Sequence, residues 1–167
     1  HYNSKRPMFD HYGVNKQIKL LFGKTVSVES GAYLVIEHTE ALHVIDVNSG
    51  QKVSKKSSQE ENAVAVNTEL AKEIARQLRL RDLGGIIIVD FIDMRNPEHK
   101  KMVYKAMKEA MSTDNARHSV VPISKIGLMQ ITRERTRPEV NISTREVCPT
   151  CAGTGKVEAP ILIVDDI

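Results

Sequence analysis

A chain of 167 residues, 41% hydrophobic and 27% charged, is long enough for one folded domain with a short appendage. Tryptophan is absent and aromatic residues make up only 4%, so the core has to come from Val, Ile, Leu and Met. The net charge of +3 is too small to identify a polyanionic partner, and no apolar run approaches the roughly 20 residues that a membrane-spanning helix needs. Because the chain begins at His1 without an initiator methionine, we expect it to be a piece of a longer protein.

The first part of the chain predicts a helix followed by three strands. Before residue 23, apolar residues recur at helical spacing: Val14, Ile18, Leu21 and Phe22. Two alternating runs, 25–30 and 33–37, predict a hairpin. A third strand is expected over residues 41–47, where the turn signal Asn48-Ser49-Gly50 ends it.

A polar, lysine-rich loop over residues 50–58 precedes a long helix. Ser58 and Glu61 have the spacing of a capping box, which marks the helix start. An apolar stripe then follows the helix: Val66, Leu70, Ile74 and Leu78. We expect Gly84-Gly85 to end this helix. Residues 86–91 are apolar on both faces, which is typical of a central strand.

A second helix and two further strands complete the predicted fold. Asn96-Pro97 places favoured residue types at the N-cap and first position of the helix. Extended segments are expected around residues 119–124 and 128–133. The order is therefore strand, strand, strand, helix, strand, helix, strand, strand. This order predicts an α/β domain with helices packed on a mixed β-sheet, followed by a short tail that contains the cysteines.

Two aspartates that end predicted strands are candidate metal ligands. Asp46 ends the third strand, and Asp90 ends the most hydrophobic one, where an unpartnered carboxylate is costly to bury. If the two strands are neighbours, both carboxylates meet at one rim of the sheet, and such hard oxygen ligands suit Mg²⁺ or Mn²⁺. The alternative is that both residues only cap turns at strand ends. Spacing alone leaves both interpretations open.

Basic residues gather in three places and are candidates for binding phosphates. Lys52 lies in the lysine-rich loop, and Arg81 lies at the end of the long helix. Arg133 and Arg135 alternate on a late segment, which puts them on one face if that segment is extended. A solvated basic face is the alternative interpretation of each cluster.

Cys148 and Cys151 are the only cysteines and form a CxxC motif. Two thiolates in a tight turn can hold one edge of a zinc ion, but a structural zinc site normally takes four ligands. Either a second copy of the chain supplies the other two thiolates, or the pair is a redox disulfide. The CxxCxGxG spelling also occurs in the zinc module of DnaJ-type chaperones, where it is repeated four times. A lone pair is no secreted disulfide scaffold, so a cytoplasmic location is expected.

Seven short segments occur in a fixed order along the chain. They are HYNS at 1–4, TEAL at 39–42, IDVNS at 45–49, NTEL at 67–70, EIARQLRLRDLGG at 73–85, IVDFIDM at 88–94 and CPTCAGTG at 148–155. Together they resemble the ribonuclease E/G family from end to end of the chain. The most specific part is the arginine-bearing helix that leads into the aspartate strand, with the cysteine motif downstream.

The resemblance implies four parts. Residues 1–22 match the end of a preceding RNase H-like subdomain, and residues 23–145 match a DNase I-like catalytic subdomain. Residues 146–156 match a zinc-link, and residues 157–167 match the start of a small dimerisation domain. The family's N-terminal RNA-binding and 5′-end-sensing domain is not in this sequence, so we expect this piece alone to be a very weak nuclease.

The resemblance also implies a chemistry, which is Mg²⁺-dependent hydrolysis of single-stranded RNA to leave a 5′-phosphate and a 3′-hydroxyl. The family's catalytic magnesium is held by the aspartates that match Asp46 and Asp90, and the asparagine that matches Asn48 orients the first of them. The cysteines that match Cys148 and Cys151 share one zinc with the same pair of a second protomer, which implies a homodimer.

The implied substrate turns the basic clusters into candidate RNA contacts, namely Lys52, Arg81, Arg133 and Arg135. The loop around Lys52 departs from the glycine- and arginine-rich version that many family members have. A non-catalytic RNA-binding or zinc-linked assembly module, in which the aspartates are structural, is the alternative function.

Overall fold

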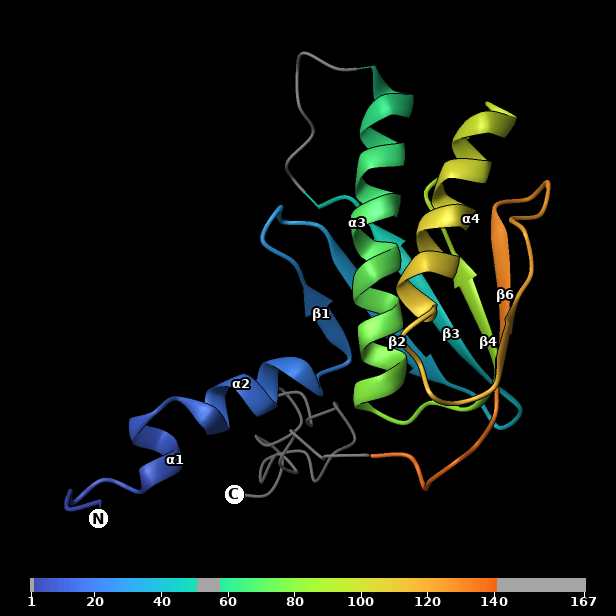
Figure 1. Cartoon of the computed structure of the whole chain (residues 1–167). Coiled ribbons are helices and arrows are strands. Elements are labelled where there is room, and N and C mark those ends of the chain that lie inside the picture. The colour runs from blue at the N-terminus through green and yellow to red at the C-terminus, as the bar shows by residue number, and fades with distance from the viewer. Residues whose placement is uncertain (1, 51–57, 141–167) are drawn as a thin grey trace, which may run out of the picture.

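The computed structural model describes residues 2–50 and 58–140 and confirms the predicted mixed α/β fold (Figure 1). Six strands form one sheet in the order β1-β2-β3-β4-β6-β5. Their bounds are β1 Thr25–Ser27, β2 Tyr33–His38, β3 Leu42–Asn48, β4 Gly85–Asp90, β5 His118–Val120 and β6 Leu128–Arg133. The β3–β4 pair is parallel, and the other neighbouring strands described are antiparallel. The predicted cysteine tail lies outside the described residues.

Among the described residues, four helices accompany the sheet: α1 Met8–His11, α2 Val14–Leu21, α3 Gln59–Leu80 and α4 Pro97–Met111. The helices α3 and α4 pack together and cover one face of the sheet, whereas α1 and α2 extend away from it beside β1 (Figure 1). We call the side of the sheet that faces away from α3 and α4 the open face. No helix in the described part of the chain is long and apolar enough to cross a membrane.

Aliphatic and methionine side chains form the core between the sheet and the two helices, as the composition predicts. Strand residues alternate between buried and more exposed positions, because successive side chains point to opposite faces. The fully buried side chains come from strands and helices alike and include Leu34, Ile45, Ile87, Met129, Ile131, Leu70, Ile74, Leu78, Met107 and Met111. Burial of this apolar layer holds the helices against the sheet.

The ends of α3 illustrate one confirmed prediction and one that is wrong. The predicted capping box is present, because the Ser58 side chain accepts from the Glu61 N–H and the Glu61 side chain accepts from the Ser58 N–H. The helix, however, ends at Leu80 rather than at Gly84-Gly85. Asp82 takes the left-handed conformation with φ of 50°, and the N–H of Leu83 donates to the Leu78 carbonyl at 3.0 Å.

The last antiparallel pair is shorter than predicted. The expected strand at 119–124 is observed as β5, which ends at Val120. Pro122 lacks an N–H and therefore cannot continue the ladder with β6.

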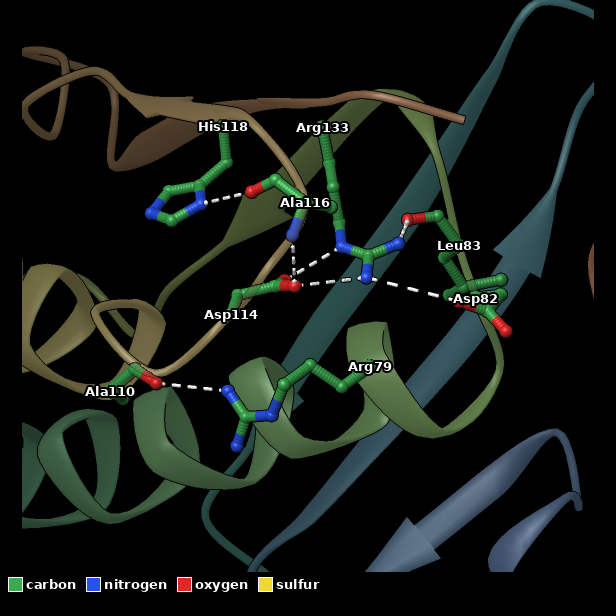
Figure 2. A network of polar contacts seen from close by, with 8 residues as sticks. All are labelled: Arg79, Asp82, Leu83, Ala110, Asp114, Ala116, His118 and Arg133. Atoms are coloured by element: carbon green, nitrogen blue, oxygen red, sulfur yellow. Dashed lines mark hydrogen bonds and ion pairs between the residues drawn. The ribbon is translucent and has the colours of Figure 1, made fainter. Parts of the chain in front are cut away.

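A buried ion pair joins β6 to the segment that follows α4 (Figure 2). The Nε of Arg133 donates to Asp114 at 2.7 Å, and the two side chains are only 4% and 3% exposed. The same guanidinium donates to the Leu83 carbonyl at 3.2 Å. Burial by itself would raise the pKa of Asp114, but hydrogen bonds from Arg133 and from the Ala116 N–H outweigh it and hold the pKa below its ordinary value.

Replacing Arg133→Met is expected to lower the free energy of unfolding by about 3–5 kcal/mol, because it leaves the Asp114 carboxylate buried without its cation. Urea unfolding measures the loss. The depressed pKa makes this stabilisation present above the unfolded-state pKa and lost as pH falls through the folded-state pKa, so the difference between the two proteins shrinks in acid. The control Arg117→Met changes an exposed arginine and should leave stability within about 0.5 kcal/mol. An equal loss in both variants would contradict the assignment.

Candidate active site

Asp46 and Asp90 lie side by side at the ends of two neighbouring parallel strands. They are register partners in the β3–β4 ladder, and adjacent strands lie about 4.8 Å apart. Ile45 and Val89, the residues before them, are buried against the helices. Because side chains alternate along a strand, the two carboxylates project from the open face.

The two carboxylates interact electrostatically, and an amide orients one of them. Burial and the negative charges of Asp46 and Asp93 raise the pKa of Asp90 above its ordinary value. The Nδ2 of Asn48, also at the end of β3, donates to Asp46 Oδ2 at 2.8 Å. Within residues 2–50 and 58–140, no salt bridge neutralises Asp46 or Asp90.

Two side chains of α3 hold the backbone that follows Asp90. Asn67 is fully buried; its Nδ2 donates to the Ile92 carbonyl at 2.8 Å, and its Oδ1 accepts from the Ile92 N–H at 3.1 Å. Glu60 Oε1 accepts from the backbone N–H groups of Arg95 and Asn96 at 3.0 and 2.7 Å. These contacts fix the exit of β4 and therefore the position of Asp90.

Grooves lie beside the same end of the sheet. One, of about 640 Å³, is lined by residues from the start of α3 and from the segment after β4, among them Asp93 and Arg95. A second, of about 320 Å³, also reaches Arg95 and is bordered by Lys100 and Lys125. Arg95 and Lys125 are both exposed and border this second groove, at the end of the sheet where Asp90 pairs with Leu128.

The donor set suits a hard divalent cation. Two carboxylates in register offer oxygen ligands without a neutralising partner among the described side chains, and after burial the charge of Asp46 contributes to raising the pKa of Asp90. Mg²⁺ and Mn²⁺ are commonly held by one or two carboxylates together with waters and phosphate oxygens. Asp46 and Asp90 therefore fit the predicted ion, and a bound cation would relieve their repulsion.

Comparison with known proteins decides the family of a chain with this arrangement. The sequence model of the Ribonuclease E/G family matches residues 1–136. The chain belongs to the ribonuclease E/G family. It is 44% identical to Ribonuclease E of Escherichia coli (strain K12) over 156 residues, 93% of this chain and 15% of that protein.

Two further relatives agree with this family membership. The chloroplastic Ribonuclease E/G-like protein of Arabidopsis thaliana is 46% identical over 92% of this chain and 15% of that protein. Ribonuclease G of Escherichia coli (strain K12) is 40% identical over 95% of this chain and 32% of that protein. The chain thus spans between 15% and 32% of the length of these three relatives.

The structure brings together the three residues that the family resemblance assigned to catalysis, Asp46, Asn48 and Asp90. The candidates for zinc and for one RNA contact, Cys148, Cys151 and Lys52, lie outside the described residues.

The three arginines predicted to contact RNA lie elsewhere, at the end of the sheet where β4 begins. Arg81 is 5% exposed and donates to the carbonyls of Leu21 and Gly23 at 2.8 and 2.9 Å. Arg133 is 4% exposed and pairs with Asp114. Their burial argues against contact with a phosphate, because both guanidinium groups already bind protein oxygens.

Arg135 differs from the other two because it is exposed. Its side chain lies over the glycines that precede β4, so that a Cβ on Gly84 would come within 2.5 Å of Arg135 Cγ. Gly85 and Asp90 are at opposite ends of the strand, which is about 17 Å long for five residue steps. Arg135 is therefore distant from the aspartates.

Sequence reasoning missed Asn67, Glu60 and the basic residues Arg95 and Lys125. A signal existed for Asn67, because a polar residue four positions before the buried Ala71 stands on the apolar side of α3. Glu60 resembles any acidic residue in a first helical turn. The two basic residues are isolated in sequence, and only the fold brings them to the same rim.

Replacing Asp46→Asn is expected to lower the pKa of Asp90 toward that of an ordinary aspartate, because one of the charges that raise it is removed. Carboxyl ¹³C NMR titration of the metal-free chain measures the change. Since the folded-state pKa is raised, the metal-free protein loses stability as pH rises through it, and this loss is smaller in the variant. Asp10→Asn in α1 is the control and should leave the pKa of Asp90 unchanged. An unchanged pKa of Asp90 in Asp46→Asn would contradict the electrostatic interaction between the two carboxylates.

Proposed function

We propose that this chain carries the hydrolytic site of an endoribonuclease that cleaves single-stranded RNA with the help of Mg²⁺ or Mn²⁺. The observation that carries the proposal is the register pairing of Asp46 with Asp90 on the open face, in a chain of the ribonuclease E/G family. The names of the relatives, Ribonuclease E and Ribonuclease G, support the reaction class.

In this proposal Asp46 and Asp90 hold the cation, which when bound supplies an activated water and stabilises charge on the scissile phosphate. Asn48 donates to one oxygen of Asp46, so it restricts the carboxylate to one orientation and leaves the other oxygen for ligation. Asn67 acts indirectly: it binds the backbone of Ile92 and so positions Asp90, without touching the cation. Hydrolysis between phosphorus and the 3′ oxygen leaves a 5′-phosphate and a 3′-hydroxyl.

Phosphate contacts are proposed at the aspartate end of the sheet. Arg95 and Lys125 are exposed there, beside the grooves described above, and Lys52 follows β3 closely in sequence. Arg135 is retained as a more distant candidate, whereas Arg81 and Arg133 are left out because of their burial.

Assembly and location complete the proposal. Cys148 and Cys151 offer two of the four ligands that a structural zinc takes, which supports a zinc shared with a second copy of the chain and hence a homodimer. A cytoplasmic location rests on the same cysteine spacing. Because the chain spans a small share of its relatives, we propose that it is a weak nuclease alone and that the remaining parts hold the substrate.

Replacing Asp46→Asn or Asp90→Asn in the longer protein is expected to reduce cleavage of a single-stranded oligonucleotide by at least about 100-fold, because each removes a charged ligand of the cation. Gel assays of cleavage and filter assays of binding measure the two activities separately. RNA affinity should stay within about threefold of the original, since neither side chain supplies positive charge. Asp10→Asn is the matched control and should cleave normally.

The non-catalytic alternative makes the opposite prediction. An assembly module with structural aspartates would show unchanged cleavage in both Asp→Asn variants of the longer protein. That result would refute the enzymatic proposal, whatever the effect on stability.

The double replacement Arg95→Ala with Lys125→Ala is expected to weaken RNA binding at low salt and to reduce the slope of log affinity against log salt by about 1–2, because two phosphate contacts are lost. Fluorescence anisotropy over a salt series measures the slope. Arg135→Ala, at the other end of the sheet, is the comparison and should have a smaller effect. If Arg135→Ala reduced the salt slope more than the double replacement does, RNA would bind at the end of the sheet where β4 begins, and the proposed contacts would be wrong.

A further inference from the structure

Two histidines and a glutamate meet at a place that the proposed active site does not use. His38 ends β2, His43 lies opposite it in β3, and Glu139 lies on the segment that follows β6. One ligand atom from each residue can be chosen so that all three lie within 4.8 Å of one another. His43 belongs to the buried, helix-facing side of β3, whereas Asp46 faces the open side. The cluster is thus separate from the aspartates.

His43 is held in one tautomer by its surroundings. Its ring is 5% exposed, and its Nε2 lies 3.1 Å from the Gly84 carbonyl, which can only accept. Nε2 therefore carries the hydrogen, and Nδ1 has a free electron pair. That electron pair points toward Nδ1 of His38 at 2.8 Å. A histidine that donates from one nitrogen to a backbone carbonyl and presents the other is oriented as metal-ligating histidines are.

His38 and Glu139 lie on the exposed side of the group. Glu139 Oε1 lies 3.0 Å from His43 Nε2, so it shares that N–H with the Gly84 carbonyl. Oε2 of the same carboxylate lies 3.9 Å from His38 Nδ1 and is the oxygen available to a cation. The N–H of Val140 donates to the Arg81 carbonyl at 2.9 Å, which anchors the backbone beside Glu139. Burial, with the nearby His43 and Arg81, holds the pKa of His38 below its ordinary value despite Glu139.

We propose that His38, His43 and Glu139 bind a divalent cation of the Zn²⁺ class. Two imidazole nitrogens and one carboxylate favour Zn²⁺ over Mg²⁺, which prefers oxygen ligands. At Zn–N distances near 2.05 Å and tetrahedral angles, two ligand nitrogens stand about 3.3 Å apart, so the 2.8 Å between the Nδ1 atoms has to widen by about 0.5 Å. His38 is half-exposed and can move by that amount.

The bound cation would join two segments that are distant in sequence. It would connect the β2–β3 hairpin to the segment that follows β6, nine residues before Cys148. Its role is structural, because it would tie that segment to the sheet. The three ligands lie outside the proposed active site, so the cation site does not depend on nuclease activity.

Zn²⁺ titration of the chain with Cys148→Ser and Cys151→Ser tests the proposal without the thiolates. Calorimetry in the presence of excess Mg²⁺ is expected to show one Zn²⁺ per chain, and imidazole ¹⁵N NMR should show shifts at Nδ1 of both His38 and His43. Added His38→Ala or Glu139→Gln should each weaken binding by at least about tenfold. His11→Ala, an exposed histidine in α1, is the matched control and should bind as before.

Two outcomes would overturn the proposal. One is the absence of Zn²⁺ binding with unmoved Nδ1 resonances of His38 and His43, which would leave the cluster as a hydrogen-bonded network only. The other is binding that survives His38→Ala and is lost in Asp46→Asn, which would assign the ion to the aspartate pair. The NMR measurement uses unaltered histidines, so it decides the question even if a variant folds poorly.

Discussion

The parallel pairing of β3 with β4 is the constraint on which the rest of this structure depends. Parallel neighbours cannot be joined by a tight turn, so the chain needs a crossover, and α3 supplies it. The crossover helix covers one face of the sheet and turns the buried sides of both strands toward it. Both strands then end at the same rim, where the pairing sets Asp46 beside Asp90. Like charges are held together because the apolar packing behind them outweighs their repulsion.

Charged side chains are exposed at one end of the sheet, and two arginines are buried at the other. At the rim where β3 and β4 end, the two carboxylates face solvent on the open face. The Asn48 amide donates to Asp46, and the Asn67 amide binds the backbone of Ile92, which follows Asp90. At the opposite end, Arg81 and Arg133 are buried, and they satisfy backbone carbonyls that follow helices. An arginine has five donors in a fixed fork, which suits it to this work inside a protein. Arginine therefore serves structure at one end of the sheet, whereas Arg95 at the other end is exposed.

The element order could be predicted because it depends on local patterns. The capping box of Ser58 and Glu61, Asn96-Pro97 and the apolar run of β4 each act within a few residues. The predicted helix end was wrong because two glycines are the stronger local signal, while Asp82 takes the left-handed conformation instead and Gly84 makes room for Arg135. Which arginines are buried and which are exposed depends on groups from distant segments, such as Asp114 for Arg133. No local sequence pattern carries that information.

For the candidate site, the sequence by itself determined the residue types and their order: two strand-ending aspartates, an asparagine two positions after the first, and a long helix between them. It also determined the family, since the matching motifs are spread along the chain. Only the tertiary structure decided that β3 and β4 are neighbours in register, that Arg95 and Lys125 share their rim, and that His38, His43 and Glu139 meet. The physical reason is that these contacts join residues far apart in sequence, and burial of the common core, rather than any local preference, sets which of them come together.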